Sequence, residues 1–322
     1  MRNDVVVARG ARSVTFPSES YLQDLADPGR PLGASRLVSL SNLAPEELSP
    51  LVEVWPGIAV DRRRSILEEL VALAEDNVEL NFDAIFLAAL KDADGEVRWT
   101  AVRGLWEYQG RDLIEPLVAL LHNDVEARVR AEAALALGRF ALRAEFQKLR
   151  ASDAERVDSA LRQTIANGDE VTEVRARAVE AVSARNVPWV HAMIREAHAS
   201  PERRLRVSAV HAMGRTCDPC WLPILFGELA NEDAEMRYEA AGACGAIGDK
   251  GCVPHILPLI EDEDAEVQSA AIDALGRIGG SEAKRALRQA LQHPRGHVRE
   301  AALAALADAE FEDDSLGLGQ RN

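Results

Sequence analysis

One pair of cysteines has a spacing that could bind a metal ion. Cys217 and Cys220 are separated by two residues, as in many zinc sites, and Cys252 lies in the corresponding turn of the next repeat described below. A structural zinc site needs four ligands, usually from two such pairs, and the chain has no second pair. We therefore expect these cysteines to be ordinary turn residues and expect no metal or cofactor. Metal binding or redox chemistry at the three thiols is the alternative.

The other reactive residue types do not form a recognisable catalytic motif. The chain has no His-Glu-x-x-His zinc signature, no phosphate-binding loop and no Gly-x-Ser-x-Gly nucleophile turn. Gly317 and Gly319 stand in a terminal segment that no strand precedes, so they do not predict a dinucleotide site. We therefore expect a protein without enzymatic activity.

Composition limits the classes of partner. The 322 residues include 53 acidic and 37 basic side chains, which gives a formal net charge of −16. Acidic side chains interrupt or offset the basic clusters at 62–64 and 203–206, so we do not expect nucleic-acid binding. No apolar run approaches the roughly 20 residues of a membrane span, and no secretory signal is visible. We expect a cytoplasmic protein without a membrane span.

The chain contains an internal sequence repeat, and this repeat sets where the residues discussed above lie. Seven segments align on one anchor residue, with successive spacings of 32, 45, 31, 31, 31 and 31 residues. Three residues after each anchor stands an alanine, and apolar or sulfur-containing residues stand one before and seven after it. The anchors are Arg98, Arg130, Arg175, Arg206, Arg237, Gln268 and Arg299, and the alanines are Ala101, Ala133, Ala178, Ala209, Ala240, Ala271 and Ala302.

These positions fall on one stripe of an α-helix, so each repeat begins with an amphipathic first helix whose small alanine lets a neighbour approach closely. Apolar residues at helical spacing in 113–121, 221–229, 253–260 and 283–291 predict a second helix in those repeats. Neither helix can bury its stripe alone, so the pairs must stack. The fold class predicted is all-α, a superhelical solenoid of about seven to eight helix pairs, with a divergent first copy around Arg63.

Composition also sets the expected boundaries. Residues 1–36 are aperiodic and predict an irregular arm, and 37–59 predict a capping helix that starts near Pro45. The solenoid is expected over 60–308, with an insertion near 141–153 in the 45-residue copy. Residues 309–322 predict an acidic, solvated tail.

The pattern Asp-x-Glu-Val-x-x-x-Ala-x-x-Ala-Leu-Gly-x-x-Gly at 264–279 resembles HEAT repeats, in the short form of phycobilisome-lyase-like proteins. The resemblance implies a concave face lined by second helices, where proteins or large ligands bind. HEAT-like deoxyhypusine hydroxylases hold iron with His-Glu pairs, and no histidine here precedes a glutamate. HEAT-like DNA glycosylases need a cationic concave face, so we expect neither enzyme type.

The anchor arginines have two interpretations. They lie at the edge of the core stripe, where they could form a ladder for phosphate or acidic ligands. Because packing devices repeat and binding sites are local, we favour a structural ladder that pairs each arginine with carboxylates or loop carbonyls of adjacent repeats. The ladder residues are Arg98, Arg130, Arg175, Arg206, Arg237 and Arg299.

Large side chains outside the core stripe are candidate anchors for a protein partner. Trp189 and Trp221 begin second helices, Trp99 and Tyr238 follow anchors directly, and Arg285 lies on the last second helix. Packing inside the fold is the competing interpretation. We predict a non-catalytic scaffold or adaptor that binds a protein partner on the concave face. A phycobilin-lyase-like or other chromophore-handling chaperone is the alternative.

Overall fold

The computed structural model describes residues 17–318, with side chains through residue 308. Every regular element in this part of the chain is a helix. The chain divides into two compact units, Met1–Leu113 and Ile114–Asn322, and each is described here by itself. The all-α prediction is confirmed for the described residues.

The first unit combines short helices with one long one. Short 3₁₀ turns at Trp55–Gly57 and Arg111–Leu113 follow α3 and α6. The cap-region helix begins at Pro45, and its Glu47 side chain accepts a hydrogen bond from the Ala44 N–H at 2.9 Å. The helices are α1 (Glu19–Ala26), α2 (Ala34–Val38), α3 (Pro45–Val54), α4 (Val60–Asp76), α5 (Asp83–Ala89) and α6 (Gly95–Gly104).

The expectation of an irregular arm over 1–36 is wrong for its described part. Helix α1 buries Leu22 and Leu25, and α2 buries Leu37. The Tyr21 hydroxyl donates to the Arg36 carbonyl at 2.7 Å and ties the two helices together. Two-turn stripes are too short to show periodicity, which explains why the sequence pattern missed them.

In the second unit, even-numbered elements are first helices and odd-numbered ones are second helices. The insertion near 141–153 lengthens one pair, since α8 continues to Glu145 and α9 begins at Ala151. Helix α18 continues to Leu318, so residues 309–318 of the predicted acidic tail prolong this helix. The helices are α7 (Ile114–Asn123), α8 (Ala127–Glu145), α9 (Ala151–Ala166), α10 (Thr172–Val182), α11 (Pro188–His198), α12 (Arg203–Arg215), α13 (Leu222–Glu228), α14 (Ala234–Ile247), α15 (Val253–Ile256), α16 (Ala265–Ile278), α17 (Gly280–Ala290) and α18 (Gly296–Leu318).

Small residues hold consecutive first helices together. All seven alanines of the repeat column are 0% exposed. A Cβ atom added to Gly214 would lie 2.6 Å from the Ala243 Cα, and one added to Gly245 would lie 2.8 Å from the Ala274 Cα. The helices therefore approach until backbone meets backbone.

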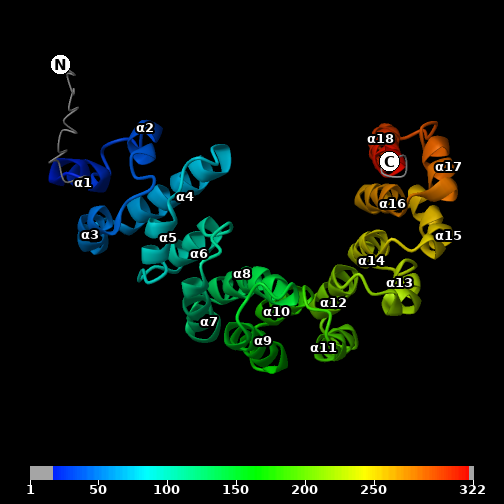
Figure 1. The fold of residues 1–322 in the computed structure, drawn as a ribbon, viewed down its shortest axis with the longest axis horizontal. Helices are drawn as coiled ribbons and strands as arrows, with labels where there is room; N and C mark the ends of the chain where they lie inside the picture. Colours follow the sequence, from blue (N-terminus) through cyan, green and yellow to red (C-terminus); the bar gives the residue numbers. More distant parts are fainter. Residues whose placement is uncertain (1–16, 319–322) are drawn as a thin grey trace, which may run out of the picture. The chain divides into compact units, whose positions relative to one another are not determined.

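Within residues 114–318, Figure 1 shows the first helices as the inner row of a curved stack and the second helices as the outer row. Consecutive first helices, from α8 to α18, pack directly on one another. The column of glycine and alanine residues allows this close spacing on one side, and unequal spacing of two rows bends a stack. The expectation that second helices line the concave side is therefore wrong for this unit.

Candidate functional site

The anchor arginines make a repeated set of contacts. In five first helices, the Nη1 of the anchor donates to the carbonyl oxygens six and five residues earlier, in the loop before its own helix. These five are Arg98, Arg130, Arg206, Arg237 and Arg299. Arg175 instead donates through Nε to the Ile165 carbonyl at 3.1 Å, and Gln268 donates to the Ile260 carbonyl at 2.7 Å.

Two anchors also reach the loop of the next repeat. Arg237 donates through Nε and Nη2 to both carboxylate oxygens of Asp262 at 2.8 Å, and Arg130 binds Glu170 in the same two-point way at 2.9 and 2.7 Å. The hydrogen bond from Arg237 lowers the pKa of Asp262. Guanidinium groups already bound to carbonyls and carboxylates are the parts of a structural ladder, not a row of free cations for a ligand.

The outward side chains of the first helices form a second feature. We call it the first-helix face, which lies on the side of α10, α12, α14 and α16 away from their buried stripes. It comprises Glu173, Arg177, Glu180, Arg204, His211, Glu235, Tyr238, Glu239, Glu266 and Asp273, with the buried Ser208 beneath Arg204 and Glu180.

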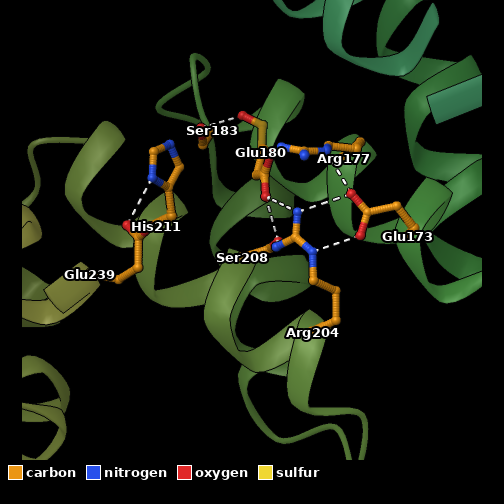
Figure 2. Close-up of polar contacts among 8 residues, drawn as sticks. All are labelled: Glu173, Arg177, Glu180, Ser183, Arg204, Ser208, His211 and Glu239. Atoms are coloured by element: carbon orange, nitrogen blue, oxygen red, sulfur yellow. Dashed lines mark hydrogen bonds and ion pairs between the residues drawn. The ribbon is translucent and has the colours of Figure 1, made fainter. Parts of the chain in front are cut away.

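Arg204 is the centre of an ion network on this face (Figure 2). Its Nε donates to Glu173 at 2.7 Å, and its Nη2 donates to Glu180 at 2.9 Å. The Ser208 hydroxyl donates to Glu180 at 2.6 Å and accepts from Arg204 at 2.5 Å. Arg177 closes the network with ion pairs to Glu173 and Glu180 at 2.8 and 2.9 Å. The network joins α10 to α12.

Burial alone would raise the pKa of Glu180, but the Ser208 hydrogen bond and the nearby arginines outweigh it, so the pKa lies below its usual range. Glu180 is therefore a firmly ionised acceptor. Ser208 is 0% exposed, so its hydroxyl cannot meet a substrate. This arrangement fixes side chains and does not activate a nucleophile.

A histidine pair continues the face toward α14. His211 Nδ1 lies 3.0 Å from Glu239 Oε2, and this hydrogen bond raises the pKa of His211. Tyr238 stands beside Glu239 and is 41% exposed. Glu235 on α14 and Glu266 and Asp273 on α16 are also exposed. Glu235 pairs with Arg203 at 2.7 Å, and Asp273 pairs with Arg277 at 2.8 Å. We call Glu235, Tyr238, Glu239, Glu266 and Asp273 the acidic half of the face.

The candidate partner-binding residues have different surroundings in the structure. Trp221 is 0% exposed, and its Nε1 donates to the Thr216 hydroxyl at 2.9 Å, so the prediction that it contacts a partner is wrong. At the start of this second helix, the Trp221 ring points into the core. Trp189 lies under the Arg162 guanidinium at 4.2 Å, and Trp99 lies under Arg103 at 4.7 Å.

Arg285 lies on α17 in the outer row, with its side chain 70% exposed. Tyr238 lies in the inner row, on α14. The two remaining exposed candidates therefore stand on opposite rows of the second unit.

The three candidate cysteines do not lie together in the structure. Cys252 is buried, and its thiol is hydrogen bonded to that of Cys244 in the core, so it does not join the exposed pair. Cys220 instead lies near His191 and Asp218, and the three ligand atoms are within 4.8 Å of one another. Sequence reasoning missed His191 because 27 residues separate it from Asp218 and no spacing rule links them.

The first unit contains an apolar cavity of about 540 Å³. Leucine, valine and alanine side chains from α3 and α5 line it, and Trp55, Arg63 and Asp92 stand at its polar side. Arg63 pairs with Asp92 at 2.9 Å, and Trp55 Nε1 donates to the same carboxylate at 2.6 Å. Arg63 and Trp55 therefore share the Asp92 carboxylate at this side of the cavity. No sequence signal pointed to this cavity, because its walls come from three separate elements.

Among the described residues, each helix is too short or too polar to cross a bilayer.

Comparisons with solved structures give the same architecture. The complex of CpcE and CpcF of the phycocyanin lyase from a Nostoc species aligns with a TM-score of 0.52 at 17% identity, over 88% of this chain and 97% of that chain. The karyopherin Kap121p, bound to the extreme C-terminus of the protein phosphatase Cdc14p, aligns with a TM-score of 0.51 at 16% identity, over 92% and 39%.

Human deoxyhypusine hydroxylase aligns at 19% identity over 91% of this chain and 95% of that chain, but its TM-score of 0.35 carries no argument. Among curated proteins, none matches the chain. The HEAT-repeat pattern matches residues 84–168 and 222–307, which together span more than half of the chain. With the stacked helix pairs, this match shows that the chain belongs to the HEAT-repeat family.

Proposed function

We propose that this protein is a non-catalytic scaffold that binds a protein segment on the first-helix face. The observation that carries the proposal is Tyr238, a half-exposed aromatic ring among carboxylates on the inner row. Tyrosine is enriched among the residues that contribute most to protein interfaces. The surrounding acids select a segment with basic side chains, which would approach favourably toward a chain of net charge −16.

The ion network next to Tyr238 supports the same proposal. Glu173, Glu180 and Arg204 already hold one another in fixed positions. A face that is ordered before binding loses little further side-chain entropy when a partner docks. The structural likeness to a karyopherin bound to the end of another protein agrees with binding of a chain segment by such a solenoid.

Capture experiments with paired variants test this proposal. The full chain, Tyr238→Ala and Arg285→Ala would serve as baits in lysate of the native host, with recovered proteins quantified by mass spectrometry. Loss of a central aromatic contact of about 2 kcal/mol predicts roughly 30-fold weaker capture by Tyr238→Ala. Arg285→Ala on the outer row should capture as the parent does. Loss of capture with Arg285→Ala alone would instead assign binding to the second helices.

One observation favours a second candidate function, the handling of a chromophore or similar ligand. The cavity of about 540 Å³ lies in the size range of small-molecule sites, and Arg63 and Asp92 stand at its edge. A linear tetrapyrrole that occupied it would quench the fluorescence of Trp55. Val52→Trp, which narrows the cavity, should abolish that quenching, and quenching that survives in Val52→Trp would rule the cavity out. We further propose a cytoplasmic location for either function.

A further inference from the structure

We propose that His191, Asp218 and Cys220 form a zinc site with three protein ligands in the second unit. Their ligand atoms lie within 4.8 Å of one another, although the residues come from two elements. His191 stands on α11, while Asp218 and Cys220 belong to the turn that leads into α13. The site lies on the outer row, away from the first-helix face, and is independent of the proposed scaffold function.

The three side chains present the donor set that zinc prefers. Imidazole nitrogen, carboxylate oxygen and thiolate sulfur all bind Zn²⁺, at roughly 2.0–2.3 Å. Magnesium and calcium take oxygen ligands and do not select a thiol or an imidazole. Three protein ligands leave the fourth tetrahedral position for water or for a group from another molecule.

The spacing needs only a small closure. Ligand atoms around tetrahedral zinc lie about 3.3–3.8 Å apart, given those bond lengths. His191 Nε2 already lies 3.8 Å from Asp218 Oδ2. Cys220 is exposed in a surface turn, so its side chain can rotate toward the other two without opening the core.

The surrounding contacts leave the ligand atoms available. Asp218 uses Oδ1 to accept the Cys220 N–H at 2.8 Å, which keeps the turn closed and leaves Oδ2 toward His191. His191 Nε2 lies 2.9 Å from Asn186 Oδ1, a contact that zinc would replace. The buried Trp221 ring, 5.1 Å from the imidazole, holds the histidine in place.

The charged groups near Cys220 affect how easily its thiol loses a proton to a metal ion. Burial and the Asp218 carboxylate raise the pKa of the Cys220 thiol, so binding must remove its proton. The Arg195 charge acts in the opposite direction on that thiol. A bound ion would tie α11 to the turn before α13, and thus join two successive second helices.

Cobalt substitution of the metal-free full chain tests the site. Co²⁺ would be titrated into the parent, Cys220→Ser, Asp218→Asn and Cys217→Ser, with absorbance recorded, and Zn²⁺ would be counted after dialysis. The parent should bind one ion per chain and show a thiolate-to-cobalt charge-transfer band. Cys220→Ser should lose that band. Asp218→Asn keeps the acceptor for the turn, so it should stay folded and bind cobalt at least about tenfold more weakly.

Cys217→Ser is the matched control, because Cys217 is exposed three residues away and lies outside the three-residue group. It should bind as the parent does. The site is refuted if the parent retains no zinc and shows no charge-transfer band. It is equally refuted if the band persists in Cys220→Ser, or disappears in Cys217→Ser, while circular dichroism shows unchanged helix content.

Discussion

The two units use glycine at helix contacts in different ways. In residues 114–318, glycine meets alanine backbone between successive first helices, as Gly245 meets Ala274. In residues 17–113, Gly104 on α6 instead meets the Phe86 ring on α5. The repeated backbone contacts belong to the unit with the regular inner row, and the apolar cavity belongs to the unit with larger, irregular side chains. The regular small residues thus accompany a continuous row of first helices, whereas the cavity lies where that regularity is missing.

The largest effect is expected from a tryptophan of the regular unit. Trp221→Ala removes a fully buried ring and leaves Thr216 without its indole donor. The free energy of unfolding should fall by about 3–5 kcal/mol. Trp106→Ala in the first unit, where the side chain is 55% exposed, is the control and should lower the free energy of unfolding by much less than Trp221→Ala does. Denaturant titration measures both, and equal effects would contradict the burial assigned to Trp221.

Glycine substitutions test the difference between the units directly. Gly245→Ala places a Cβ 2.8 Å from the Ala274 backbone, so two helices must separate, and overpacking of this kind costs about 1–3 kcal/mol. Gly104→Ala meets the buried Phe86 ring rather than backbone, and because one side chain can shift more readily than two helices can separate, its cost should be smaller. Gly242→Ala on the same α14 has open space and should stabilise by up to about 1 kcal/mol through helix propensity.

Thermal and denaturant unfolding of the three glycine variants would rank these costs. A neutral Gly245→Ala would contradict the close backbone contact between α14 and α16 in the inner row. A Gly104→Ala variant that is the less stable of the two would reverse the distinction drawn between the units.

The smallest effect concerns pH. The hydrogen bond that His211 donates to the Glu239 carboxylate raises the pKa of His211 above its ordinary value of 6.5. The pair therefore stabilises the fold fully below about pH 6.5 and loses that contribution as pH rises through the folded-state pKa. The His211 side chain is 43% exposed, so the contribution should stay below about 1 kcal/mol.

Unfolding measurements between pH 6 and 9 on the parent and on His211→Gln would reveal this linkage. The difference in stability should be largest at the acid end and shrink as pH rises. A difference that grows with pH would show that the imidazole is held neutral, against the assigned Glu239 contact.

The repeat positions were predictable because packing repeats with the sequence. Seven alanines at one offset required one buried column, and all seven are buried. Asp94, Asp233 and Asp264 obey a rule of the same local kind, because each stands directly before a first helix and accepts a backbone N–H at its start. Local rules of this kind need no knowledge of the overall geometry.

Other features depend on geometry that no stripe encodes. A buried stripe predicts that two helices pack together, but it does not predict whether the first or the second helices form the inner row. The concave side was therefore assigned wrongly. The prediction that Trp221 points outward was wrong because its ring turns toward Thr216 within the same turn. The pairing of His191 with Cys220 and the cavity beside Trp55 both need side chains from separate elements to be placed in space.

Site-specific photocrosslinking in the native host tests the central claim most directly. A photoreactive phenylalanine would replace Tyr238 on the inner row in one strain and Arg285 on the outer row in another, and adducts would be identified by mass spectrometry. The account predicts a discrete crosslinked protein from position 238 and none from position 285. Adducts from position 285 alone, or from neither position, would contradict a binding face on the first helices.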